Sequence, residues 1–406
     1  MDKYDRYSER LRNKKKRLLD SLILNEILTD KRLIKAFMDI PLEKFIPEKL
    51  LNVLKLYEDV PNLFYFDEQN PRNYRTISAP HMITIMLQGL ALNSDDDLLI
   101  LGAKSGYIAA LAHKLAPKGE IIILEANSEI AKITSNNLKE LNLDDKISII
   151  VKNPLYGMSD LSPWQKILVT GAIEQSKIHP LLTQLDEDGG VLFAPIGSEF
   201  VQIYTQILRQ KNEFFGKKQL QVKFSPLITQ VELDELELIT DIDEMEVTKD
   251  SEVINEVSNL SRNKINIKYT SEILDKITSE HQGEIQDIDD TQRNEILSNL
   301  NIIEQNIKNL KNEEDIQNWI EIIDDTENKI NNLKKFKKIF SIKVKRMQNI
   351  LNQIRSYNIV RKELEKSPLN DLVIIDKKIE IINKQIEQIN LFLEITQNEI
   401  IRIKTL

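Results

Sequence analysis

Short, uninterrupted apolar runs alternate with amphipathic stretches between residues 76 and 197. The apolar runs predict strands over 97–103, 119–127, 146–153, 165–173 and 189–197. The amphipathic stretches predict helices over 80–92, 106–115, 128–141 and 178–186. Strands that are apolar along their whole length are typical of a parallel sheet covered on both faces. Strand and helix in alternation therefore predict an α/β fold, a doubly wound Rossmann-like sheet, preceded by helices over residues 1–60 with a break at Pro41.

The last third of the chain follows a different pattern. From Leu372 to Ile403, apolar residues recur in steps of three and four, which is the spacing of a coiled-coil seam. Shorter runs with the same spacing cover 296–310 and 340–354. The pattern predicts long helices, interrupted at Pro368, that fold into an antiparallel coiled-coil hairpin. Pairing between two chains is the alternative, and the sequence alone does not decide between them.

Charge separates these two regions. The segment 231–256 holds eleven acidic residues and one lysine. We expect three parts: an α/β domain over 1–233, an acidic linker with short helical elements over 234–290, and the helical extension over 291–406. The whole chain carries a net charge of −9 and no nucleic-acid reader motif, so we do not expect nucleic acid as a partner.

Composition excludes several kinds of chemistry. The 406 residues include no cysteine, which rules out a thiolate metal site and a cysteine nucleophile. The four histidines lie too far apart for a metal motif of the His-Glu-x-x-His type, so we expect no metal. The charged first twenty residues lack the apolar core of a secretory signal, and no run is long enough to span a membrane. We therefore expect a cytoplasmic protein without a membrane partner.

The turn after the first predicted strand is the candidate ligand site. In a doubly wound sheet, ligands bind beyond the carboxyl ends of the strands. Gly102 permits a sharp turn there, and Gly106 allows close approach of the backbone to a ligand. Glu125 follows nineteen residues later, at the end of the second strand, where a carboxylate accepts hydrogen bonds from ribose hydroxyls. This pattern predicts an adenosine-containing cofactor, with packing of helix on strand as the alternative explanation for the glycines.

A resemblance to a known family is carried by several segments. The stretch TISAPHM, residues 76–82, resembles the signature of protein-L-isoaspartate O-methyltransferases. Segments 38–50, 98–117 and 181–197 resemble other parts of that family, in its order and spacing. The resemblance covers about residues 20–230. It implies transfer of a methyl group from S-adenosylmethionine to the carboxylate of isoaspartyl residues in damaged proteins, without a metal.

The same resemblance implies roles for particular residues. Ser78 stands at the position of the family's active-site serine, whose hydroxyl would orient the substrate carboxylate; a helix N-cap is the alternative role. The cofactor contacts carried over are Thr76, Ile77, Gly102, Ser105, Gly106, Glu125 and Asn153. The expected partners are isoaspartyl proteins or peptides, together with self-association or a protein partner through the C-terminal helices.

Other positions depart from the family pattern. Ile100 replaces an acidic residue, Lys104 replaces a glycine, Arg75 replaces a glutamine, and Asn153 replaces an acidic residue near the adenine end. Lys104 offers a cation to the carboxylate end of the cofactor. These changes keep a second hypothesis open, in which a catalytically silent methyltransferase fold serves as a structural or binding module through its coiled coil.

Overall fold

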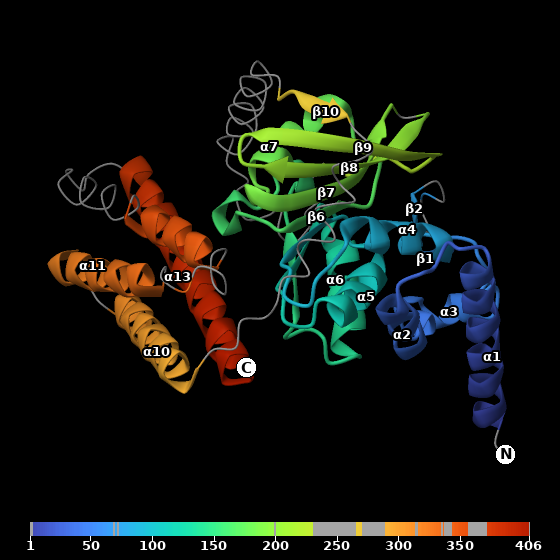
Figure 1. The fold of residues 1–406 in the computed structure, drawn as a ribbon, viewed down its shortest axis with the longest axis horizontal. Helices are drawn as coiled ribbons and strands as arrows, with labels where there is room; N and C mark the ends of the chain where they lie inside the picture. The colour runs from blue at the N-terminus through green and yellow to red at the C-terminus, as the bar shows by residue number, and fades with distance from the viewer. Residues whose placement is uncertain are drawn as a thin grey trace. The chain divides into compact units, whose positions relative to one another are not determined.

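The computed structural model describes residues 3–67, 70, 73–198, 200–229, 265–269, 289–312, 316–333, 336, 343–355 and 372–405. The chain divides into two compact units (Figure 1). The first unit contains Met1–Met158 and Trp164–Gln282, and the second contains Ser159–Pro163 and Gly283–Leu406. The two units are described separately below.

A mixed sheet, eight-stranded over the described residues, forms the centre of the first unit. The strands are β3 (Leu98–Leu101), β4 (Ile121–Glu125), β5 (Ile147–Val151), β6 (Lys166–Val169), β7 (Asp188–Gly197), β8 (Gln202–Gln210), β9 (Glu213–Val222) and β10 (Ile267–Tyr269). Their order in the sheet is β10-β9-β8-β7-β6-β3-β4-β5, and β3 to β7 are mutually parallel. The predicted Rossmann-like α/β sheet is therefore confirmed, with its five parallel strands at the predicted places.

Three strands of this sheet were not predicted. β8 pairs antiparallel with β7, and β9 pairs antiparallel with β8, so the sheet is mixed rather than wholly parallel. β10 lies inside the range predicted as a linker and pairs parallel with residues 214–216 of β9. A separate hairpin of β1 (Asn62–Phe66) and β2 (Tyr74–Ile77) was also not predicted, and β2 leads directly into the segment that carries Ser78.

Helices connect and cover the strands of the sheet. The predicted ones form as α4 (Pro80–Leu90), α5 (Tyr107–Leu115), α6 (Ser128–Lys139) and α7 (His179–Thr183). Because β3, β4 and β5 are consecutive parallel neighbours, right-handed crossovers place α5 and α6 on one face. The N-terminal region forms α1 (Lys3–Leu24), α2 (Lys31–Asp39) and α3 (Glu48–Leu51), with a 3-10 turn at Leu42–Phe45 between α2 and α3. Further 3-10 turns lie at Lys104–Gly106, Pro154–Tyr156, Ser159–Leu161 and Gln175–Lys177.

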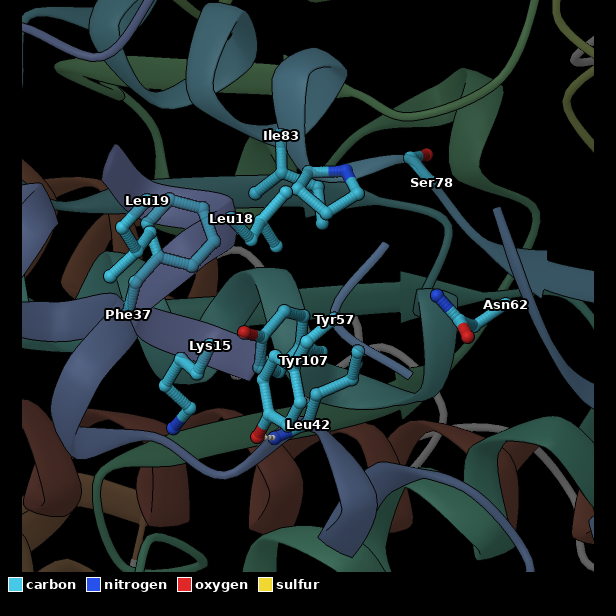
Figure 2. Close-up of a pocket in the computed structure, with 11 residues that line it drawn as sticks. Lys15, Leu18, Leu19, Phe37, Leu42, Tyr57, Asn62, Ser78, Ile83 and Tyr107 are labelled. Atoms are coloured by element: carbon cyan, nitrogen blue, oxygen red, sulfur yellow. Dashed lines mark hydrogen bonds between the residues drawn. The ribbon is translucent and has the colours of Figure 1, made fainter. Parts of the chain in front are cut away.

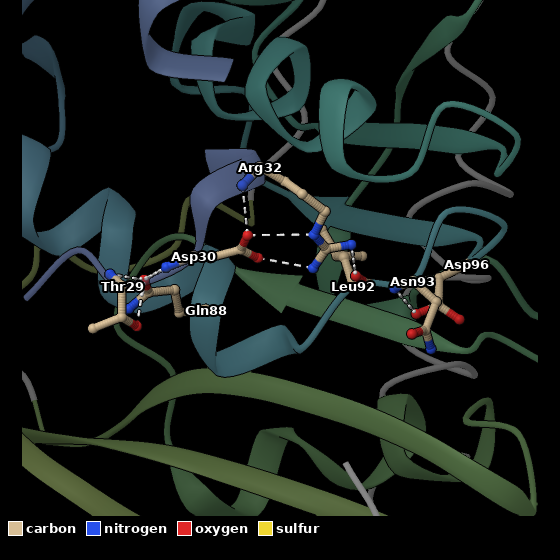
Figure 3. Close-up of polar contacts among 7 residues, drawn as sticks. All are labelled: Thr29, Asp30, Arg32, Gln88, Leu92, Asn93 and Asp96. Atoms are coloured by element: carbon tan, nitrogen blue, oxygen red, sulfur yellow. Dashed lines mark hydrogen bonds and ion pairs between the residues drawn. The ribbon is translucent and has the colours of Figure 1, made fainter. Parts of the chain in front are cut away.

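Hydrogen bonds attach the N-terminal helices to α4 (Figure 3). The Gln88 side-chain oxygen, near the end of α4, accepts from the backbone N–H groups of Thr29 (2.8 Å) and Asp30 (3.0 Å). Asp30 also caps α2 by accepting from the Arg32 N–H at 2.7 Å. The Arg32 guanidinium then donates to the Leu92 carbonyl at 2.9 Å, just beyond α4. The helix that follows Ser78 is thus held at its C-terminal end by the N-terminal region.

The second unit is helical. Its described helices are α10 (Asp290–Asn312), α11 (Ile316–Leu333), a helix over 343–355, and α13 (Leu372–Thr405), and α10 packs against both α11 and α13. The described part of this region thus holds more helices than the predicted pair. Pro368 and the acidic segment 231–256 lie outside the described residues. In the described ranges, every helix is too short or too polar to cross a membrane.

The buried face of α13 differs from the predicted seam. Ile389 and Ile403 are buried as predicted, and Phe392 and Ile395 between them are buried as well. Ile386, however, lies on the same spacing of three and four residues and near the middle of the predicted seam, yet it is 48% exposed, so its predicted place in the seam is wrong. The buried stripe is wider than a strict two-position seam, as is typical of a helix packed in a globular bundle.

Candidate active site

A cavity of about 410 Å³ lies beyond the carboxyl ends of β3, β4 and β6. The chain runs from β3 to β4 on one side and later returns to place β6 on the other side, so this is the topological switch point of the sheet. The lining includes Tyr74–Thr76, Gly102–Lys104, Glu125, Thr170–Gly171 and Ser225–Ile228. Its size is within the usual range of small-molecule sites.

The turn after β3 requires a glycine at its first position. Gly102 has a φ of +93°, in the region that favours glycine. A Cβ atom there would lie 2.4 Å from the Thr170 hydroxyl oxygen. That hydroxyl donates to the carbonyl of Leu101 at 2.8 Å and is also 3.0 Å from the carbonyl of Gly102. Thr170, at the end of β6, therefore fixes the turn and keeps side chains out of this part of the cavity wall.

Glu125 is held in place by the backbone. It is 6% exposed, and its two carboxylate oxygens accept from the N–H groups of Ala103 (2.9 Å) and Asn127 (3.1 Å). The first of these bonds connects the end of β4 to the turn after β3. A carboxylate offers about four lone-pair positions, so Glu125 retains acceptor capacity toward the cavity that it lines. The carboxylate thus lies at the end of β4, where the sequence predicted it, with its position fixed by the backbone.

Lys104 adds a cation to the same cavity. Its φ of +45° and the φ of +63° at Ser105 are unusual for residues with side chains, so this turn is strained. Burial lowers the pKa of Lys104 from 10.5 to about 8; Glu125 raises it, and Arg75 lowers it further. Lys104 therefore interacts electrostatically with Glu125 on β4 and with Arg75 on β2.

The predicted cofactor residues divide into two groups. Thr76, Gly102 and Glu125 line the cavity. The others do not line it: Ile77, Ser105, Gly106 and Asn153. Gly106 has a φ of +89°, and a Cβ atom there would lie 3.1 Å from a methyl group of Thr134 on α6, so the left-handed backbone and helix packing together account for this glycine. The Asn153 side-chain oxygen accepts from the Leu155 N–H at 3.0 Å and caps a short turn.

Ser78 lines a much smaller cavity of about 10 Å³ (Figure 2). The serine is 7% exposed, and its neighbours in the lining include Asn62, Tyr57 and Tyr107. Figure 2 shows the Ser78 hydroxyl directed away from the two tyrosines. A cavity of this size holds at most one water molecule. The serine thus sits between the packed N-terminal helices and the start of α4.

The alternative role of Ser78 as a helix cap is wrong. The N-cap position of α4 is Ala79, and it makes no side-chain capping bond. The Asp59 carboxylate instead accepts from the N–H of His81 at 2.9 Å and lies 2.8 Å from the Nδ1 atom of the same residue. Asp59 therefore caps α4 and fixes the His81 ring, leaving the Ser78 hydroxyl available for another partner.

One departure from the family pattern, at Ile100, has a structural explanation. Ile100 is 1% exposed and pairs with Ile123 and Leu168 in the middle of the sheet, so this position belongs to the core rather than to the cavity lining. The bond from Glu125 to the Ala103 N–H tethers the turn from the neighbouring strand. The loss of an acidic residue at position 100 therefore leaves the turn anchored.

Sequence reasoning missed Arg75 and Thr170 as site residues, and it missed the segment 225–228. A signal existed for Thr170, because it is a polar residue immediately after a buried apolar strand, at the carboxyl end where ligands bind. Arg75 carried no such signal, since the hairpin of β1 and β2 that places it was not predicted.

The sheet, its switch-point cavity and the fixed Glu125 define a Rossmann-like α/β protein with a site suited to an adenosine-containing cofactor. A family model described as protein-L-isoaspartate(D-aspartate) O-methyltransferase matches residues 13–232, and the chain belongs to this family. The match ends before residue 283, where the C-terminal segment of the second unit begins.

Two relatives illustrate the similarity. The protein-L-isoaspartate O-methyltransferase of Ignicoccus hospitalis is 32% identical over 220 residues, which are 54% of this chain and 99% of the relative. The protein-L-isoaspartate O-methyltransferase of Thermosipho melanesiensis is 35% identical over 201 residues, which are 49% of this chain and 94% of the relative. A solved structure of a Plasmodium falciparum protein assigned to the same class, in complex with S-adenosyl-L-homocysteine, is 24% identical with a TM-score of 0.44 and covers 52% of this chain and 97% of that one.

Proposed function

We propose that this chain methylates the free carboxylate of isoaspartyl residues in damaged proteins, using S-adenosylmethionine bound in the 410 Å³ cavity. The observation that carries the proposal is the position of Glu125, fixed by two backbone bonds at the switch point of the sheet. Family membership supplies the reaction, and the cavity supplies a place for its cofactor.

The cavity residues fit this cofactor. Glu125 would accept hydrogen bonds from the ribose hydroxyls, because it lines the cavity and its two backbone bonds leave acceptor capacity on the carboxylate. Gly102 and Thr76 would form the backbone wall beside the cofactor. Bound there, S-adenosylmethionine supplies a methyl group on a positively charged sulfur, which is a good leaving group. The remaining predicted cofactor residues, Ile77, Ser105, Gly106 and Asn153, would act through the packing that shapes the turn and its surroundings.

Ser78 is proposed as the residue that orients the acceptor. A carboxylate is already a competent nucleophile, so the protein needs no general base and contributes mainly by positioning. The Ser78 hydroxyl makes no hydrogen bond among the described residues, and Asp59 performs the capping that would otherwise occupy it. The hydroxyl is therefore able to donate to an acceptor oxygen.

A pair of peptides tests the proposed function. The two peptides share one sequence and differ only in whether a single residue is linked as isoaspartate or as aspartate. The full chain is expected to transfer a labelled methyl group from S-adenosylmethionine to the first peptide and not to the second. Equal labelling of both, or of neither, would reject the proposed specificity or the activity itself.

The second unit is proposed to be a self-contained coiled-coil-like bundle of one chain. Apolar residues of α10 and α13, among them Leu300, Ile303, Ile389 and Phe392, are already buried within a single copy. A second chain is therefore not needed to cover them. Multi-angle light scattering is expected to give a monomer, and a concentration-dependent dimer that dissociates when α13 is disrupted would favour self-association instead.

A further inference from the structure

Arg75 and Lys104 bring positive charge to the same cavity. Arg75 comes from β2, and Lys104 comes from the turn after β3, yet both line the cavity beside Glu125. The positive charge of Arg75 contributes to the lowered pKa of Lys104. Such a pair in a partly buried space is unfavourable unless anions compensate it.

Glu125 does not neutralise these cations by direct contact. Its oxygens accept from the backbone at Ala103 and Asn127, and within the described residues no ion pair links it to Arg75 or Lys104. The Arg75 Nη1 atom donates to the Tyr74 carbonyl at 2.9 Å, whereas its buried Nε atom has no hydrogen-bond partner among the residues that the structure describes. Leaving a buried guanidinium N–H without a hydrogen-bond partner costs free energy, so a ligand that places an acceptor beside Arg75 would be stabilised.

The missing acceptors are best matched by carboxylates. Methyl transfer to isoaspartate brings in the carboxylate of the cofactor's amino-acid end and the carboxylate of the acceptor residue. Lys104 lies on the turn that borders the cofactor cavity and is coupled to Glu125. Arg75 lies three residues before Ser78 on the segment proposed to meet the acceptor.

We propose that Lys104 binds the carboxylate at the amino-acid end of the cofactor and that Arg75 binds the carboxylate of the acceptor. This inference rests on the proposed function and deepens it. It gives a use to the side chain at position 104, where the family pattern has glycine. Charge-assisted hydrogen bonds of this kind are about twice as strong as neutral ones.

Calorimetry on the full chain tests the role of Lys104 with two ligands. S-adenosylhomocysteine carries the amino-acid end, whereas 5′-methylthioadenosine shares the adenosine and the thioether but lacks that end. Lys104→Gln is expected to weaken S-adenosylhomocysteine binding about tenfold to a hundredfold and to leave 5′-methylthioadenosine binding unchanged. Lys114→Gln, at an exposed position on α5, serves as the matched control and should change neither.

The outcomes separate the inference from the proposed function. Equal losses for both ligands, or no loss for either, would overturn the role of Lys104 while leaving the methyltransferase assignment intact. Wild-type protein that binds neither ligand would overturn both. Thermal melting of each variant identifies any loss of folded protein, and Lys104→Arg, which keeps the charge, should retain most of the affinity if charge is what matters.

Steady-state kinetics test Arg75. Arg75→Gln is expected to raise KM for the isoaspartyl peptide about tenfold or more, with an unchanged affinity for S-adenosylhomocysteine. Arg75→Lys should recover part of the loss. An Arg75→Gln variant that weakens S-adenosylhomocysteine and leaves the peptide KM unchanged would overturn the assignment, because both cations would then serve the cofactor.

Discussion

The hydroxyl oxygen of Thr170 lies 2.4 Å from the position that a Cβ atom at Gly102 would occupy. Two strands that are neighbours in the sheet, β3 and β6, thus meet at their carboxyl ends with no room for a side chain. Gly102 and Thr170 both line the 410 Å³ cavity, so the requirement for glycine at position 102 also shapes the wall of that cavity.

Gly102→Ala is expected to destabilise the fold by about 2 kcal/mol or more, because it combines a clash with a φ of +93°. Chemical denaturation measures the change in the free energy of unfolding. A double-mutant cycle with Thr170→Ala separates the two causes. The cost should be smaller in the Thr170→Ala background, and an equal cost there would mean that backbone strain alone is responsible.

Glu125→Gln is expected to weaken S-adenosylhomocysteine binding about tenfold to a hundredfold. The amide keeps the size of the side chain, but its NH₂ group is unable to accept from the backbone N–H of Ala103 or Asn127. Calorimetry gives the dissociation constant. Glu140→Gln, an exposed residue paired with Lys44 on the surface, is the matched control. Equal affinities for wild type and Glu125→Gln would remove Glu125 from the cofactor site.

Ser78→Ala is expected to lower kcat for the isoaspartyl peptide with little change in S-adenosylhomocysteine affinity. Its stability should stay within about 0.5 kcal/mol of wild type, because Ser78 does not cap α4. Asp59→Ala, by contrast, removes the observed cap and should cost about 1 kcal/mol. A Ser78→Ala protein that loses stability and keeps full turnover would return this serine to a structural role.

Binding of S-adenosylhomocysteine is expected to weaken as the pH rises above about 8. Burial holds the pKa of Lys104 at about 8, so its charge is lost in this range; Glu125 and Arg75 are the charged groups that face it. Calorimetry from pH 6.5 to 9.5 measures the binding free energy of wild type and of Lys104→Gln. Subtracting the value for Lys104→Gln from the value for wild type at each pH removes the contribution of the ligand's own amino group, because both proteins bind the same ligand. A difference that does not change with pH would contradict the prediction.

Protein stability should depend on pH in the opposite direction. The folded-state pKa of Lys104, about 8, lies below its usual value of 10.5, so between these values the unfolded chain binds more protons. Without ligand, wild type should therefore gain stability relative to Lys104→Gln as the pH rises from 8 to 10.5. Paired denaturation curves at several pH values check the sign.

Ile389→Asp is expected to unfold the second unit. Ile389 is 1% exposed on α13, and an unpaired charge buried there typically costs several kcal/mol. Ile401→Asp changes the same residue type at a 58% exposed position on the same helix and should be nearly neutral. Circular dichroism reports the loss of helix. If both variants lose helix equally, the exposed and buried faces of α13 are misassigned.

The parallel half of the fold was predictable because its strands carry a strong local signal. Residues 98–101 and 121–124 are continuous apolar runs, and such runs bounded by turn residues indicate buried strands. In β8, by contrast, the apolar pairs Ile203–Tyr204 and Ile207–Leu208 are four residues apart, which fits a helical period as well as a strand. Its pairing with β7 is decided by tertiary contact.

The site was predictable where it depends on chain order and not where it depends on packing. Glu125 follows from its place at the end of a strand, and Gly102 from the turn before a helix. Arg75 reaches the cavity because the hairpin of β1 and β2 places it there, and Ile386 is exposed because a different stripe of α13 is buried. Such contacts leave no trace in local periodicity.

The pairing of β10 with β9 has a consequence for self-association. An uncovered sheet edge is a template on which another molecule adds a strand, and natural proteins protect such edges with short strands or lysines. β10 covers residues 214–216 of β9, the part that contains two phenylalanines, while the part that no described strand pairs with on this edge continues with Lys217 and Lys218. A shortened chain that ends before residue 267 would therefore expose the apolar, lysine-free part of the edge and become prone to edge-to-edge aggregation, even with the methyltransferase cavity intact.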